Sequence, residues 1–116
     1  MTPPKTRSED GQGDQKQFSA LVSQLIRANR DLWDETKADF AHGFGADSYG
    51  SAIGIMVQAA AQNVLNSLSP AERTRLEDFA MKRIPSNAPD RSCSALMTHE
   101  WMVRANRSVS RNGYYG

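Results

Sequence analysis

Hydrophobic residues recur at three- and four-residue steps along most of the chain, which is the spacing of amphipathic helices. The first such segment runs from about residue 16 to 41, with apolar positions Phe18, Leu21, Val22, Leu25, Ile26, Leu32, Trp33 and Phe40. Further segments cover about 48–68, 70–84 and 92–106. Because no stretch alternates as a strand would, the sequence predicts an all-α fold, a small bundle of about four helices.

The second segment carries no charged side chain between Asp47 and Glu72. Its predicted core face consists of Ile53, Met56, Val57, Ala60, Ala61, Val64 and Leu68. The other side presents an amide line and two small residues that would let another backbone approach closely. Since a helix face in water normally carries charge, we expect this side to be covered as well. The predicted oligomer interface consists of Gly50, Gly54, Ile55, Gln58, Gln62 and Asn66.

Local signals set the predicted boundaries. Ser69, Pro70 and Glu72 form a capping box with proline at the first helical position, and Ser48 is the expected N-cap of the preceding helix. Asn29 falls at a core position of a heptad seam, where a polar residue can fix register. The seam lasts fewer than three heptads and other apolar residues widen the stripe, so a bundle helix is the better interpretation. The prolines and glycines of the polar start predict a disordered arm over 1–16, followed by one helical domain over 17–106 and a flexible basic and aromatic tail over 107–116.

Composition narrows the class further. The chain has 116 residues and a formal net charge of +1, which suits one domain without a global field for nucleic acid. A lone cysteine, Cys93, excludes an internal disulfide, and the start lacks an apolar signal core, so the expected location is the cytoplasm. A membrane span is not expected, because Gln58, Gln62, Asn63 and Asn66 would all lie in hydrocarbon.

Residues capable of catalysis are sparse. His42 and His99 lie far apart and fit no zinc-ligand spacing. Cys93 near a helix start could have a lowered thiol pKa, although a buried cysteine acting as a small hydrophobe is the commoner case. The sequence therefore predicts a protein that is not an enzyme, with no catalytic residue, cofactor, metal or small-molecule substrate identified.

The basic and aromatic C-terminal region offers an alternative function. Arg104, Arg107 and Arg111 precede Tyr114 and Tyr115. Arginine side chains can hold phosphates while tyrosine rings stack on bases, so these five residues are candidate nucleic-acid contacts of a small regulatory protein. A solvated basic tail is the simpler interpretation, because acidic residues alternate with the other basic ones and the net charge is nearly neutral.

The stretch Gly54-Ile-Met-Val-Gln-Ala-Ala-Ala-Gln-Asn63 resembles the helical motif of the R-body (Reb-type, "killing trait") proteins, small bacterial proteins that co-assemble into coiled ribbons. The matching positions are Gly54, Ile55, Gln58, Ala60 and Gln62. The family's glutamine run is replaced here by Asn66-Ser-Leu-Ser69. The resemblance implies a self-assembling subunit whose partners are further copies or related small helical subunits. The predicted function is thus that of a small helical interaction or assembly protein that self-associates through its uncharged central helix.

Overall fold

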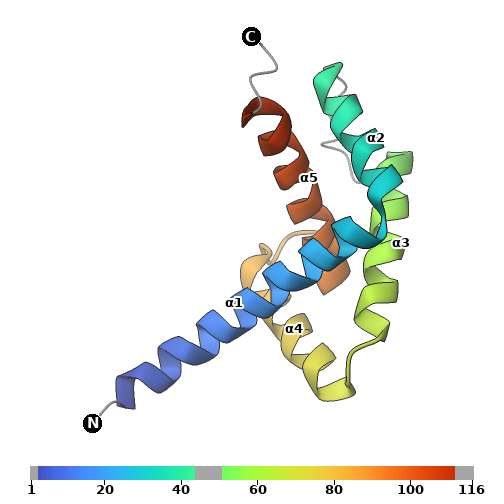
Figure 1. The fold of residues 1–116 in the computed structure, drawn as a ribbon. Helices are drawn as coiled ribbons and strands as arrows, with labels where there is room; N and C mark the ends of the chain where they lie inside the picture. Colours follow the sequence, from blue (N-terminus) through green and yellow to red (C-terminus); the bar gives the residue numbers. More distant parts are fainter. Residues whose placement is uncertain (1–2, 44–50, 112–116) are drawn as a thin grey trace.

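The computed structural model describes residues 3–43 and 51–111, and within these ranges the chain is helical without strands (Figure 1). The elements are α1 (Pro3–Ala28), α2 (Arg30–Ala41), α3 (Ala52–Asn66), α4 (Pro70–Arg83) and α5 (Cys93–Arg111). The all-α prediction is confirmed. The described residues form five helices, where about four were expected.

The additional helix arises at Asn29, where the single helix expected over 16–41 is interrupted. Asn29 has φ −130° and ψ 54°, outside the helical region. Its side-chain Nδ2 donates to the Leu25 carbonyl oxygen at 2.9 Å, the kind of local bond by which asparagine competes with helix hydrogen bonds. The helix therefore does not continue through Asn29 as a heptad seam, which was the less favoured of the two interpretations. The Asn29 backbone turns α2 away from the direction of α1 (Figure 1).

Both ends of the helical domain extend beyond their predicted limits. Helix α1 begins at Pro3, so most of the expected N-terminal arm has helical backbone, and this part of α1 projects from the other helices (Figure 1). Proline is tolerated there because the first turn needs no N–H partner. Helix α5 continues to Arg111, since no glycine or proline interrupts the chain before Gly113.

The caps of α3 and α4 follow the usual chemistry. Helix α3 begins after Ser51, whose Oγ accepts from the Gly54 N–H at 3.0 Å. The expected cap, Ser48, lies outside the described residues. The capping box before α4 is confirmed: Ser69 Oγ accepts from the Glu72 N–H at 3.2 Å, and Glu72 Oε1 accepts from the Ser69 N–H at 3.1 Å. The bond from the Ser69 backbone also holds the pKa of the Glu72 carboxyl below its usual value.

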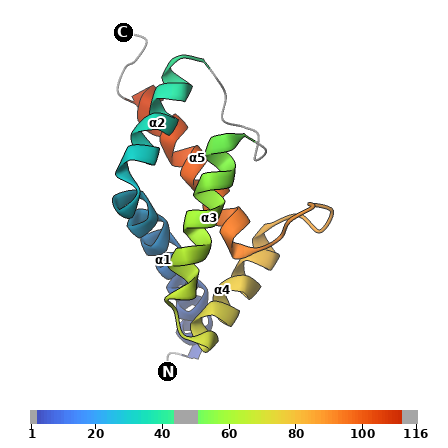
Figure 2. The same cartoon turned by 90° about the vertical axis from the view of Figure 1, so that its right-hand side faces the viewer.

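Helix α5 lies in the middle of the molecule and contacts the other four helices (Figures 1 and 2). The Trp101 ring is fully buried and packs edge-on against Trp33 of α2, with ring centroids 5.2 Å apart. Its Nε1 donates to Thr36 Oγ1 at 3.0 Å, and that hydroxyl donates to the Leu32 carbonyl oxygen at 2.8 Å. The aromatic contact and this hydrogen-bonded chain fix α2 on α5.

A helix that crosses a bilayer needs about 20 predominantly apolar residues. None of the helices in the described ranges is both long enough and apolar enough to cross a membrane.

Candidate interaction surface

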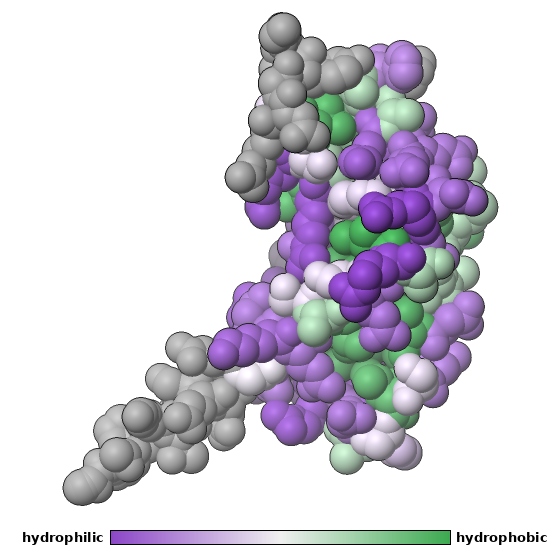
Figure 3. Space-filling model, viewed as in Figure 1, coloured by the Kyte–Doolittle hydropathy of each residue, from purple (hydrophilic) through white to green (hydrophobic). Residues whose placement is uncertain are grey.

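Helix α3 is buried along one side and exposed along the other. The buried side consists of Ile53, Gly54, Val57, Ala61, Val64 and Leu65. The exposed positions, here called the outer stripe, are Ala52, Ile55, Met56, Ala59, Gln62, Asn63 and Asn66. They recur at three- and four-residue steps along the helix and include no charged side chain. Figure 3 shows apolar patches interrupted by polar ones on the side of the molecule where α3 lies.

The predicted core face of α3 was partly wrong. Met56, expected inside, is 47% exposed, whereas Leu65, which the prediction omitted, is fully buried. Both sides of this helix lack charge, so the sequence contains no charged residue that would mark which apolar side faces water. The observed orientation is set by packing, since α3 lies against α1, α2 and α5.

The structure separates the residues of the predicted oligomer interface. Ile55, Gln62 and Asn66 belong to the outer stripe, and Ile55 is 60% exposed. Gly54 is buried within the fold, and Gln58 is half-buried. Gly50 lies outside the described residues. The structure adds Ala52, Met56, Ala59 and Asn63 to this surface. The three- and four-residue spacing from Ile55 could have identified Ala52 and Ala59.

One amide beside the outer stripe and one within it already have partners within the chain. Gln58 Nε2 donates to Asp90 Oδ2 at 2.9 Å, which ties α3 to the loop before α5. Asn66 Oδ1 accepts from Arg73 of α4. Gln58 therefore contributes to the fold itself, while the exposed amides of Gln62 and Asn63 are the polar groups that face outward from the stripe.

The candidate nucleic-acid contacts have different surroundings. The Arg104 side chain is 22% exposed, and its guanidinium joins α5 to α1 by donating to Ser23 Oγ at 3.1 Å and to Ser19 Oγ at 3.0 Å. It also donates to Glu100 Oε2 at 3.0 Å. Arg107 is exposed. The side chain of Arg111, and all of Tyr114 and Tyr115, lie outside the described residues. Arg104 thus acts within the fold, and a nucleic-acid surface stays a prediction.

The cysteine and the histidines considered for catalysis lie in different parts of the fold. Cys93 is buried at the start of α5, and burial, reinforced by the Glu77 carboxylate, raises the pKa of its thiol to about 12. Such a thiol is protonated at neutral pH and is a poor nucleophile. His42 is exposed, and its Nδ1 lies 2.7 Å from the Ala38 carbonyl oxygen. In the described part of the chain, no three His, Cys, Asp or Glu side chains come together as metal ligands would.

A cleft of about 400 Å³ lies beside the loop that joins α4 to α5, and no sequence pattern predicted it. Its prolines, Pro85 and Pro89, identified only the loop itself. The cleft walls come from that loop, from α3, from Arg83 at the end of α4 and from α5, which includes His99, so they meet only in the folded chain.

Comparisons of the chain with models of protein families, with curated proteins and with solved structures found no match.

Proposed function

We propose that this protein is a small helical interaction protein without enzymatic activity, and that it self-associates by packing the outer stripe of α3 against the same stripe of a second copy. The observation that carries the proposal is the composition of α3. Its 15 residues contain no charge, although 23% of the residues in the chain are charged. An exposed helix face of this kind suits contact with another protein better than contact with water.

The chemistry of the stripe favours a second copy as the partner. Its first half is apolar, with Ile55, Met56 and Ala59, and its second half carries the amides of Gln62 and Asn63. A parallel pairing of two α3 helices would place apolar on apolar and amide on amide. Each amide both donates and accepts hydrogen bonds, so identical amides can pair, whereas identical charges would repel. Ala59 at the middle would let the two helices approach closely.

The size of the stripe sets the expected affinity. A helix of this length spans roughly 22 Å, and one of its faces provides less than the roughly 800 Å² per partner of a standard stable interface. We therefore expect a dissociation constant in the micromolar range or weaker, and an equilibrium between monomer and dimer that depends on protein concentration.

Sedimentation equilibrium over a wide range of protein concentrations tests the proposal. The unchanged chain should dimerise, and Ala59→Glu should abolish the dimer because it buries two like charges against each other. Ala71→Glu is the matched control, since Ala71 is an exposed position on α4. A monomer at every concentration, or a dimer that Ala59→Glu does not affect, would contradict the proposal.

The resemblance of residues 54–63 to R-body proteins supports a more specific proposal. In that case the chain is a bacterial, cytoplasmic subunit that assembles beyond the dimer, with further copies or with related small helical subunits. Negative-stain electron microscopy of the concentrated protein, alone and with such subunits, should then show ribbons. Particles no larger than a dimer in both samples would rule out ribbon assembly and leave the dimer to be tested separately.

A further inference from the structure

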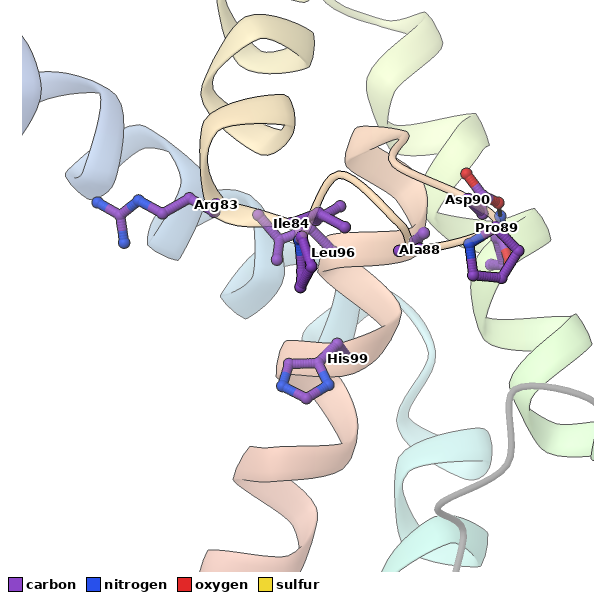
Figure 4. Close-up of a pocket in the computed structure, with 10 residues that line it drawn as sticks. Arg83, Ile84, Ala88, Pro89, Asp90, Leu96 and His99 are labelled. Atoms are coloured by element: carbon purple, nitrogen blue, oxygen red, sulfur yellow. Dashed lines mark hydrogen bonds between the residues drawn. The ribbon is translucent and has the colours of Figure 1, made fainter.

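The cleft beside the α4–α5 loop has the dimensions of a small-molecule site. Its volume of about 400 Å³ falls within the roughly 300–1,000 Å³ of typical ligand pockets. Ile84, Pro85 and Ala88 of the loop and Leu96 of α5 supply apolar walls. In Figure 4, Ile84 and Leu96 lie together in the middle of the view, and Asp90 lies at the end next to α3.

Hydrogen bonds hold the loop wall in place. The Ala88 N–H donates to the Pro85 carbonyl oxygen at 3.0 Å and closes a turn. Asp90 Oδ1 accepts from the Ser92 N–H at 2.9 Å, immediately before α5. Pro85 and Pro89 restrict the backbone further because their rings fix φ. A wall that is already ordered loses little conformational entropy when a ligand binds.

One end of the cleft is negatively charged. Asp90 Oδ2 accepts from Gln58 Nε2 at 2.9 Å, and each carboxylate oxygen can accept a further hydrogen bond. Hydrogen bonds from Ser92 and then from Gln58 hold the pKa of the Asp90 carboxyl below its usual value, so the group is ionised at neutral pH. The guanidinium of Arg83 lies 4.5 Å from the centre of the Phe79 ring, and Figure 4 shows its side chain pointing away from the other labelled residues.

We propose that this cleft binds a small apolar molecule that carries a primary amine. The apolar body packs against Ile84 and Leu96, and the ammonium group donates to the Asp90 carboxylate and to the Gln58 side-chain oxygen. Gln58 can accept in this way because its Nε2 is already directed at Asp90. The ammonium charge of the ligand is thereby paired with the Asp90 carboxylate at one end of the cleft. Burial of the apolar part of the ligand against the apolar wall adds a hydrophobic contribution to binding.

An NMR titration of the ¹⁵N-labelled protein with 2-phenylethylamine tests this proposal. The amides of Ala88, Asp90 and Leu96 should shift, with a dissociation constant on the order of 1 mM for so small a probe. The neutral 2-phenylethanol and the anionic 3-phenylpropanoate should bind about tenfold more weakly or not at all, because they lack the charge-assisted bond to Asp90.

Two variants with a matched control complete the test. Asp90→Asn keeps an oxygen for the Ser92 N–H and should weaken amine binding about tenfold, to the level of the alcohol. Ala88→Leu should block all three probes by filling the cleft, whereas Ala71→Leu on α4 should have no effect. The proposal is overturned if the shifts fall outside the cleft, if the alcohol or the acid binds as well as the amine, or if Asp90→Asn binds the amine unchanged. The spectrum of each variant without probe reports whether its fold is intact.

Discussion

The buried hydrogen bond between Trp101 and Thr36 allows a quantitative prediction. Both side chains are fully buried, and Thr36 Oγ1 is the acceptor that the Trp101 indole N–H reaches, at 3.0 Å. Thr36→Val replaces the hydroxyl by a methyl group of similar size, so it leaves no large cavity. It removes the acceptor from an indole N–H that water does not reach.

The expected cost follows from that burial. A buried donor left without a partner costs about 1–3 kcal/mol, and the added methyl group regains up to about 0.8 kcal/mol by its own burial. We therefore expect Thr36→Val to lower the free energy of unfolding by about 1–2 kcal/mol. For a domain of this size that corresponds to a fall of roughly 4–8 °C in Tm.

Urea unfolding followed by far-ultraviolet circular dichroism measures this difference, and a double-mutant cycle with Trp101→Phe isolates the bond. In the Trp101→Phe background the indole N–H is absent. The loss in free energy of unfolding caused by Thr36→Val should therefore be smaller there by about 1 kcal/mol or more. If Thr36→Val costs nothing in the unchanged chain, or costs the same in both backgrounds, the reasoning from the hydrogen bond is refuted.

Three further predictions follow from the described contacts. Cys93 should resist a thiol reagent at pH 8 until the protein unfolds, because burial keeps its pKa at about 12; fast labelling of the folded protein would contradict this. Arg104→Ala should lower the free energy of unfolding by about 1–3 kcal/mol and speed amide exchange in α1, whereas the exposed Arg107→Ala should change stability by no more than about 0.5 kcal/mol. Because the pKa of Asp90 is lower in the folded chain, its ionised carboxylate contributes stability above the ordinary aspartate pKa of about 3.9. This contribution is lost as the pH falls through the lower folded pKa. Urea unfolding should therefore show the difference in stability between the unchanged chain and Asp90→Asn shrinking from pH 7 to pH 3.

Local sequence signals predicted those parts of the fold that local chemistry determines. The capping box at Ser69 and Glu72 needs only residues three apart, and it was correctly placed. The break at Asn29 was missed because the apolar spacing continues across it, so the pattern is compatible with one helix. The interruption depends on a side-chain bond to Leu25, which competes with the helix and which spacing alone does not reveal.

The candidate interaction surface was predictable in kind but not in detail. The missing charge on the central helix can be read from the sequence, because that property needs no tertiary information, and its use as an interface stays a prediction. Which residues form the surface depends on how α3 is rotated against its neighbours, so Met56 was expected inside and Leu65 was not expected there. The cleft was not predictable at all, because Gln58 and Asp90 meet only through packing of distant segments.

The central position of α5 has a consequence for how the protein is made. Every other helix packs on α5, and Trp101 and Arg104 supply the contacts that hold α2 and α1. A nascent chain that ends before Cys93 lacks the helix on which the other four described helices all pack, although α1 can already contact α3 and α4. The core is therefore completed only after α5 has been synthesised, and until then the apolar sides of α1 to α4 that face α5 stay exposed to chaperones and to other nascent chains.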